Sequence, residues 1–409
     1  MQKNRGYVVG MRSVQDANTL LARVKSQIAL PALLFAIFHL PFGPSGCTRT
    51  PPAGGPLAYS TCFGEVGMSP GQFSYPRGMD HDDTTIWVVD KAARVQRIDP
   101  KTGDSLSGWR MPDWKLGKPT GITVWKPKGG GGGGTDADER IFVADTHYHR
   151  VMIYAFGKAA LQPGEKDPGN DGTAWGAPVR LVGQFGGYGT RAGQFTYPTD
   201  IAVLPTRDGK SIKRLYVSEY GGCDRVSVYE PSGPDAYECK FTFGRFGSGG
   251  GAEPVEFSRP QSIAIDADRN ELIVADACNH RLGRFTTEGR LVKWISSPDL
   301  AGSPPGQFMY PYGLSLIGDG TAMVAEFGNN RVQHIDLDSG ESLGIYGQQG
   351  RGDGQLATPW AVTVQGETMY VLDSGNNRVM GVMGVATPRV GRARAAAFNP
   401  AVAAAKGAS

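Results

Sequence analysis

Short apolar runs alternate with turn-forming residues from about residue 59 to residue 383. In one representative unit, the segment Gly306-Gln307-Phe308-Met309-Tyr310-Pro311 precedes a short apolar run, and a second run, Met323–Ala325, ends on Glu326. Asparagine and glycine follow, and Arg331 opens a third run. Proline cannot donate to a sheet ladder and is best placed at the first residue of a strand, and the asparagine–glycine segment is typical of a hairpin. The pattern therefore predicts short antiparallel strands.

The same unit recurs along the chain at a period of roughly 40 to 50 residues, which is typical of repeat architectures. In every copy an apolar residue stands three positions before a proline: Phe73, Leu116, Phe195, Phe257, Phe308 and Leu356. A glycine-punctuated aromatic run, such as residues 240–244, supplies a fourth strand. Six repeats of four short antiparallel strands predict an all-β fold, a six-bladed β-propeller.

The two ends of the repeat region complement each other. The last repeat supplies only three strands before the chain becomes basic and alanine-rich near residue 384, whereas residues 60–64 have the character of the missing fourth strand. We therefore expect the N-terminal strand to complete the last blade, which removes an open sheet edge. The predicted organisation is an export segment (1–47), a flexible linker (48–58), the propeller (59–383) and a basic, alanine-rich disordered tail (384–409).

Each second strand ends on a carboxylate, and an arginine follows four to six residues later. The pairs are Asp90 and Arg94, Asp145 and Arg150, Glu219 and Arg225, Asp276 and Arg281, Glu326 and Arg331, and Asp373 and Arg378. Such pairs could be general acid–base machinery, but a catalytic residue needs to occur only once. Because the pairs recur in every repeat, they are interpreted as structural ties.

The repeat resembles the NHL repeat, most closely at residues 276–281, 328–332 and 373–379, and the resemblance extends over roughly residues 59–383. It implies a propeller fold but no particular activity. The NHL enzymes that cleave amidation intermediates place three metal-binding histidines directly after the blade prolines. In this chain those positions hold Arg77, Thr120, Thr199, Gln261, Tyr312 and Trp360.

None of these positions holds a histidine, and His147, His149 and His280 are interpreted as turn residues. Metal-dependent lactonases of similar shape need several acidic or amide ligands, whereas Asp200 stands alone one position further along. The sequence therefore predicts no metal, no cofactor and no catalytic residue. The residues after the prolines, together with Asp200, are expected to rim the central channel.

The predicted rim mixes aromatic and polar side chains, as a binding surface does. The alternative is that its aromatic residues only plug the channel. We expect a non-catalytic module that binds an unidentified protein or small ligand. The alternative function is a propeller lyase or lactonase, similar to the amidating lyases, with its site at the channel mouth.

Charge and cysteine content narrow the range of partners. The net charge is +3, but residues 59–383 hold 32 basic against 38 acidic residues, which argues against nucleic acid as a partner. Cys223 and Cys239 fall within one blade, so an oxidising compartment would permit a disulfide. The alternative is that these residues, Cys62 and Cys278 are free, partly buried thiols.

The N-terminal segment has the features of an export signal. Arg12, Arg23 and Lys25 precede the apolar run 28–42, which is too short for a comfortable membrane span but suits a signal-peptide core. The run is followed by Pro44-Ser45-Gly46-Cys47, which resembles a bacterial lipoprotein signal except at Pro44. This resemblance implies an exported protein anchored to a membrane by lipid on Cys47. The alternatives are cleaved secretion and an uncleaved anchor.

Overall fold

The computed structural model describes residues 59–128, 139–157 and 174–384. The predicted export segment with Cys47, the linker, and the tail beyond Gly384 lie outside these ranges. Within them, no helix is long and apolar enough to cross a membrane.

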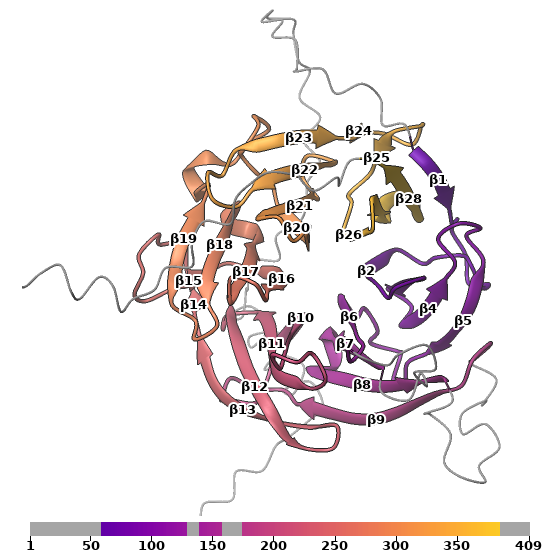
Figure 1. Cartoon of the computed structure of the whole chain (residues 1–409), viewed down its shortest axis with the longest axis horizontal. Helices are drawn as coiled ribbons and strands as arrows, with labels where there is room; N and C mark the ends of the chain where they lie inside the picture. Colours follow the sequence, from indigo (N-terminus) through magenta and orange to yellow (C-terminus); the bar gives the residue numbers. More distant parts are fainter. Residues whose placement is uncertain (1–58, 129–138, 158–173, 385–409) are drawn as a thin grey trace, which may run out of the picture. The chain divides into compact units, whose positions relative to one another are not determined.

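Six four-stranded antiparallel sheets, the blades, stand around a central hole (Figure 1). Blade 1 consists of β2 (Pro76–His81), β3 (Ile86–Asp90), β4 (Arg94–Ile98) and β5 (Ser105–Arg110); blade 2 of β6 (Gly121–Trp125), β7 (Arg140–Asp145), β8 (Arg150–Phe156) and β9 (Val179–Gly186); blade 3 of β10 (Tyr197–Pro205), β11 (Ile212–Tyr220), β12 (Arg225–Gly233) and β13 (Ala236–Phe243). Blade 4 consists of β16 (Pro260–Asp266), β17 (Glu271–Asp276), β18 (Arg281–Thr286) and β19 (Leu291–Ile295); blade 5 of β20 (Pro311–Leu316), β21 (Thr321–Glu326), β22 (Arg331–Asp336) and β23 (Ser342–Tyr346); blade 6 of β26 (Ala361–Gln365), β27 (Thr368–Asp373), β28 (Arg378–Met383) and β1 (Tyr59–Phe63). The predicted all-β, six-bladed propeller is confirmed.

The remaining elements are short. The links between blades contain two parallel pairs, β14 (Arg245–Phe246) with β15 (Glu256–Phe257) and β24 (Gln348–Gln349) with β25 (Gln355–Leu356). Single 3-10 turns occur at η2 (Thr146–Tyr148), η4 (Ala277–Asn279), η5 (Pro298–Leu300) and η6 (Ser374–Asn376).

Blade 6 contains strands from both ends of the described chain. β1 pairs antiparallel with β28, with Cys62 opposite Met380 and Phe63 opposite Val379 (Figure 1). The outermost strand of this blade therefore comes from the N-terminal side, as the strand count along the sequence indicates. This pairing occupies the edge that β28 would otherwise present to another chain.

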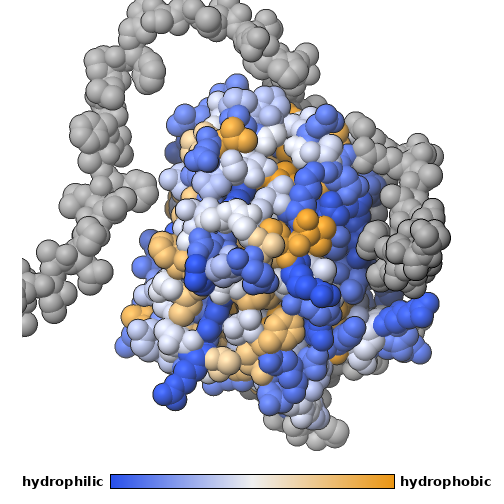
Figure 2. All heavy atoms as spheres, turned by 90° about the vertical axis from the view of Figure 1, so that its left-hand side faces the viewer, coloured by the Kyte–Doolittle hydropathy of each residue, from blue (hydrophilic) through white to orange (hydrophobic). Residues whose placement is uncertain are grey.

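The hydrophobic core lies between neighbouring blades. One cluster, for example, joins Ile273 and Leu282 of blade 4 to Val324 and Ile335 of blade 5. Five of the six apolar residues that precede the prolines are fully buried: Phe73, Phe195, Phe257, Phe308 and Leu356. The outer wall near blade 4 is mostly hydrophilic, with apolar side chains in scattered patches (Figure 2).

The second repeat departs from this pattern. Leu116 is 59% exposed, whereas Met111 is 1% exposed and belongs to the cluster between blades 1 and 2. The interpretation of Leu116 as an apolar residue equivalent to the other five was therefore wrong. The link before Pro119 lacks the Gly-Gln-Phe segment, and Met111 occupies the core instead.

Each carboxylate–arginine pair is in contact in the structure, and we call these pairs the hairpin ties. The nitrogen–oxygen distances are 2.5 Å for Arg94–Asp90, 2.9 Å for Arg150–Asp145, 2.7 Å for Arg225–Glu219, 2.8 Å for Arg281–Asp276, 2.6 Å for Arg331–Glu326 and 2.7 Å for Arg378–Asp373. The carboxylates are almost fully buried. An ion pair so enclosed depends on its partner, because a lone buried charge is strongly unfavourable.

The hairpin ties also explain the recurring segment before each proline. In blade 5, Glu326 Oε2 accepts the backbone N–H of Met309 at 2.9 Å, and Arg331 donates to the carbonyl of Gln307 at 3.1 Å. Blades 1, 3, 4 and 6 repeat both contacts. Each tie thus holds the incoming link against the hairpin that joins the second and third strands.

The hairpin tie of blade 2 is built differently. Arg150 donates to Asp113 at 3.1 Å, a side chain of the link, in place of a link carbonyl. The sequence of this link is also the least regular, which fits the altered contact.

The proposed disulfide between Cys223 and Cys239 does not form, since both residues are free thiols. Cys239 stands opposite Tyr229 in the β12–β13 ladder, whereas Cys223 precedes Arg225 at the far end of β12. Four residues along a strand span roughly 13 Å, and a disulfide requires Cα atoms within about 7 Å. Cys223 and Cys239 belong to the same blade, as predicted, but they lie at different heights along its strands.

Candidate functional site

The innermost strands of all six blades enclose a central cavity of about 260 Å³. Five of the six residues that follow the blade prolines line it: Arg77, Thr120, Gln261, Tyr312 and Trp360. Asp200 also lines the cavity, whereas Thr199 does not. We call the end of the cavity that carries these residues the channel mouth.

The two threonines of the predicted rim contact neighbouring blades. Thr199 is fully buried, and its Oγ1 lies 2.7 Å from Ser218 Oγ and 2.7 Å from the carbonyl oxygen of Pro260. Thr120 Oγ1 lies 2.9 Å from the carbonyl oxygen of Thr199. Their hydroxyls therefore connect consecutive blades. This leaves Arg77, Gln261, Tyr312 and Trp360 as the rim residues with side-chain donors that no described residue accepts.

Arg77 lies between two aromatic rings without a polar partner. Its Cζ is 5.0 Å from the ring centroid of Trp360 and 5.8 Å from that of Tyr75. Among the described residues, its guanidinium donates no hydrogen bond and forms no ion pair, and Nε is buried. Burial lowers the pKa of Arg77, and the nearby charge of Arg259 acts in the same direction. The guanidinium still remains protonated near neutral pH, with its donors unused.

A second arginine, Arg259, which sequence reasoning missed, lies beside the mouth in contact with the rim residues Gln261 and Tyr312. Its Cζ is 4.7 Å from the ring centroid of Tyr220 and 5.2 Å from that of Tyr312, and its Nε donates to Gln261 Oε1 at 2.9 Å. It forms no ion pair with any residue in the described ranges. Arg259 stands directly before Pro260 with a left-handed φ of 57°. The signal was present in the sequence, because the other residues before the blade prolines are Tyr, Lys or Thr.

Two deeply buried neutral side chains add further donors. Gln261 is 2% and Tyr312 8% exposed. Within the described part of the chain, neither the Gln261 amide nitrogen nor the Tyr312 hydroxyl has a hydrogen-bond partner. Burial raises the pKa of Tyr312 to about 12, so its hydroxyl keeps its proton. Both side chains line the cavity, so these two unused donors are available to a ligand there.

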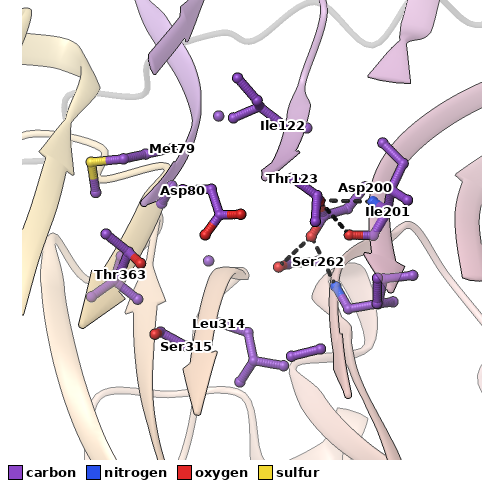
Figure 3. A pocket seen from close by; sticks show the side chains of 18 of the residues that line it. Met79, Asp80, Ile122, Thr123, Asp200, Ile201, Ser262, Leu314, Ser315 and Thr363 are labelled. Atoms are coloured by element: carbon purple, nitrogen blue, oxygen red, sulfur yellow. Dashed lines mark hydrogen bonds between the residues drawn. The ribbon is translucent and has the colours of Figure 1, made fainter. Parts of the chain in front are cut away.

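Two carboxylates point into the same cavity (Figure 3). Asp200 Oδ2 accepts hydrogen bonds from Ser262 Oγ at 2.8 Å and from the backbone N–H of Ile263 at 3.0 Å. Burial raises the pKa of Asp200 to about 7, and the charge of Asp80 raises it further. Asp80 accepts the backbone N–H of Val124 at 2.7 Å, and burial raises its pKa too.

The expectation that Asp200 stands alone was therefore wrong. Asp80 occupies the position that Thr123, Ser315 and Thr363 hold in other blades, where a carboxylate in an otherwise apolar run is a visible signal. Within the described ranges, no group of three or more His, Cys, Asp or Glu side chains could hold a metal ion. The histidines interpreted as turn residues contact tyrosines: His147 and His149 lie beside Tyr197, and His280 lies beside Tyr310.

Comparison with known proteins agrees with this architecture. The NHL repeat family model matches residues 257–285, which run from β15 into β18 of blade 4. The chain is an NHL-repeat β-propeller.

Two curated relatives and one solved structure are similar to this NHL-repeat propeller. Mouse NHL repeat-containing protein 3 is 28% identical over 176 residues, 41% of this chain and 48% of that protein. Mouse peptidyl-glycine alpha-amidating monooxygenase is 30% identical over 154 residues, 37% of this chain and 13% of that protein. The match thus spans less than half of either relative.

The solved structure is that of a Bacteroides thetaiotaomicron protein of unknown function. It superposes with a TM-score of 0.53 at 14% identity and covers 78% of this chain and 72% of its own. At this identity the likeness shows the fold alone.

Proposed function

We propose that this NHL-repeat propeller is a non-catalytic binding module whose channel mouth takes a small organic carboxylate. The observation that carries the proposal is the pair Arg77 and Arg259: each guanidinium lies beside two aromatic rings and forms no ion pair with a described residue, although the backbone N–H of Arg259 donates to Asp224. A guanidinium has five N–H donors in a planar fork that matches a carboxylate. Arg259 uses one of them on Gln261, and Arg77 uses none on described residues.

The surroundings of the two arginines favour an anion with an apolar body. The rings of Tyr75, Tyr220, Tyr312 and Trp360 lie beside the two guanidinium groups, and those of Tyr312 and Trp360 line the cavity. The cavity of about 260 Å³ lies just below the usual range for drug-sized ligands, roughly 300–1,000 Å³. A small ligand, or one end of a larger one, fits this space.

The test is calorimetric titration with hexanoate, and with hexanamide as the uncharged control. We expect hexanoate to bind and Arg77→Gln to weaken it by roughly tenfold or more, since hydrogen bonds to charged groups contribute about 1.5–3 kcal/mol. The matched control is Arg207→Gln in the exposed β10–β11 hairpin.

Two outcomes would overturn the proposal: equal binding of hexanamide and hexanoate, or an affinity for hexanoate that does not depend on Arg77. Inorganic phosphate and sulfate serve as a further arm. If only these ions bind through Arg77, the site takes inorganic oxyanions, and the carboxylate proposal is wrong.

A second candidate function is a lyase or lactonase at the same cavity. It is favoured by Asp200, whose pKa of about 7 suits a general base at neutral pH, and by the similarity to the amidating monooxygenase. Turnover by such an enzyme should rise with pH through an inflection near 7 and be abolished in Asp200→Asn. If turnover of a cleavable carboxylate survives this substitution, Asp200 is not the base.

We further propose that the protein is exported and held at a membrane by lipid on Cys47. The support is the basic and then apolar character of residues 12–42 followed by Pro44-Ser45-Gly46-Cys47. Cys47→Ser should shift the protein from the membrane fraction to the soluble extracytoplasmic fraction, or stall its processing. Globomycin should lead to accumulation of the precursor, and a precursor indifferent to both treatments would contradict the lipid anchor.

A further inference from the structure

We propose that the ligand of the central cavity is a zwitterion of amino-acid type, with its carboxylate on Arg77 and Arg259 and its ammonium group between Asp80 and Asp200. This inference rests on the proposed carboxylate-binding function and specifies the other end of the ligand.

The positive charge of Arg77 and the negative charges of Asp80 and Asp200 lie at successive levels of one cavity. Arg77 follows the first blade proline, and Asp80 stands three residues further along β2, which corresponds to roughly 10 Å. Asp200 accepts a hydrogen bond from Ser262, which follows Gln261 in the chain. Asp200 therefore lies close below the mouth. Figure 3 shows Asp80 and Asp200 projecting into the channel from different blades. Positive charge at the mouth and negative charge below it are complementary to a ligand that carries both.

Unlike the carboxylates of the hairpin ties, neither cavity carboxylate forms an ion pair with a lysine or arginine of the described ranges. Asp200 accepts hydrogen bonds only from neutral groups, the hydroxyl of Ser262 and the backbone N–H groups of Ile201 and Ile263. Asp80 has His81 at 3.6 Å, and a quarter of its side chain (26%) is exposed. The six tie carboxylates, by contrast, each contact an arginine. An ammonium group would supply Asp80 and Asp200 with the missing counter-charge.

An independent feature also indicates a ligand here. Gln261 and Tyr312 are more than nine-tenths buried, line the cavity, and have a free amide N–H and a free hydroxyl among the described residues. Both adjoin the arginines, since Gln261 accepts from Arg259 and the Tyr312 ring lies beneath its guanidinium. They can donate to a carboxylate or to a backbone-like carbonyl of the same ligand.

The size of the cavity limits the distance between the two charges. The cavity has a volume of about 260 Å³, and Arg77 and Asp80 are separated by three residues along β2. This space admits a free amino acid or an ω-amino acid of a few carbons. A longer zwitterion would need to leave one of its charges outside the cavity.

The test is a series of matched ligands. Glycine, β-alanine, 4-aminobutyrate, 5-aminovalerate and 6-aminohexanoate are titrated beside the simple carboxylates of equal chain length. At one chain length the zwitterion should bind roughly fivefold or more tightly than its matched carboxylate, because charges that pair inside a cavity contribute clearly to affinity. Asp200→Asn, with Asp80→Asn as a second variant, should bring this ratio to about one. Arg207→Gln should leave it unchanged.

Proton release gives a second readout that a purely steric preference would not produce. The titratable groups that face Asp200 in the cavity are Arg77, Asp80 and His81 of β2 and Tyr312 of β20; the described lining residues of β6, β16 and β26 are uncharged. With a pKa of about 7, Asp200 is roughly half protonated at pH 7, and an ammonium group would displace that proton. Calorimetry in two buffers of different ionisation enthalpy should show proton release with the zwitterion and none with the carboxylate.

The outcomes separate the two proposals. If carboxylates bind through Arg77 but no zwitterion binds more tightly than its match, the zwitterion inference is overturned and the proposed function stands. If neither series depends on Arg77, the proposed function fails as well. Circular dichroism of each variant confirms that a lost preference is not lost folding.

Discussion

Arg281 and Arg77 are both held against tryptophan rings, yet their surroundings differ completely. Arg281 is 1% exposed, donates to Asp276 at 2.8 Å and to the carbonyl of Glu256 at 2.8 Å, and stacks over Trp294 at 3.6 Å. Arg77 stacks on Trp360 but has no hydrogen-bond partner in the described ranges. An arginine that pairs with the carboxylate of its hairpin occurs in every blade, whereas Arg77 and Arg259 are each found in one blade only.

The difference separates residues that build the ring from residues available to a ligand. The arginine of a hairpin tie donates to a carboxylate and, in every blade except blade 2, to a carbonyl of the link, so the same arginine is needed in each repeat. At the position of Arg77 the other blades have threonine, glutamine, tyrosine or tryptophan, and at the position of Arg259 they have tyrosine, lysine or threonine. In a repeat protein, a departure from the repeat at a lining position is therefore the better indicator of a site.

The largest expected effect is on the most buried hairpin tie. Arg281→Ala leaves the carboxylate of Asp276 without its cation, and removal of one partner of a buried pair costs about 3–5 kcal/mol. Urea denaturation should show this loss. A change below about 1 kcal/mol in the free energy of unfolding would mean that the tie contributes little to stability. Arg281 and Arg77 would then not differ in their structural role.

A smaller effect is expected at the irregular hairpin tie of blade 2. Arg150 is more exposed (17% of its side chain) and contacts Asp113 in place of a link carbonyl. Arg150→Ala should therefore cost less than Arg281→Ala, about 1–2 kcal/mol by the same measurement. Equal losses at the two sites would show that burial does not set the strength of the ties.

Asp200 should make stability depend on pH. Its pKa of about 7 in the folded state lies above the ordinary value near 4, so the folded protein binds more protons than the unfolded chain between these values. Its contribution to stability is therefore lost as pH rises from about 4 to 7. Asp200→Asn removes this term, so the variant should gain about 2 °C or more in Tm relative to wild type on going from pH 5 to pH 8. A constant difference between the two proteins would contradict the raised pKa.

The smallest expected effect on stability is that of Arg77→Gln. Because the guanidinium contacts no acidic group in the described ranges, its loss should change the free energy of unfolding by no more than about 0.5 kcal/mol. Thermal unfolding beside the Arg207→Gln control checks this. A loss as large as that of a hairpin tie would make Arg77 a structural residue.

The architecture could be predicted from the sequence because each blade repeats the same residue types at the same spacing. The spacing of prolines, carboxylates and arginines predicts blades and ties, and Phe308 or Glu326 can be identified by comparison with five other copies. Leu116 was misplaced for the same reason, since its link does not follow the repeat and Met111 is buried in its stead. The disulfide failed because a shared blade does not fix the level of each residue within it.

The site was predictable only in part. Arg77, Gln261, Tyr312 and Trp360 follow from the position after each proline, but Thr199 turns its hydroxyl to a neighbouring blade. Arg259 and Asp80 were missed because they lie at other positions of the repeat: Asp80 lines the cavity from β2, and Arg259 contacts the rim residues Gln261 and Tyr312. The contacts across blades at the cavity join residues far apart in the sequence, 44 positions for Asp80 and Val124 and 62 for Asp200 and Ser262, and no local pattern encodes them.

The central claim is that Arg77 serves a ligand whereas the tie arginines serve the fold. The most direct test measures hexanoate affinity and the urea midpoint together for Arg77→Gln and Arg331→Gln. We predict that Arg77→Gln loses roughly tenfold or more in affinity at an unchanged midpoint. Arg331→Gln should lower the midpoint and, below its unfolding transition, keep the wild-type Kd. If Arg77→Gln lowers the midpoint as much as Arg331→Gln does, or binds hexanoate like wild type, the claim is contradicted.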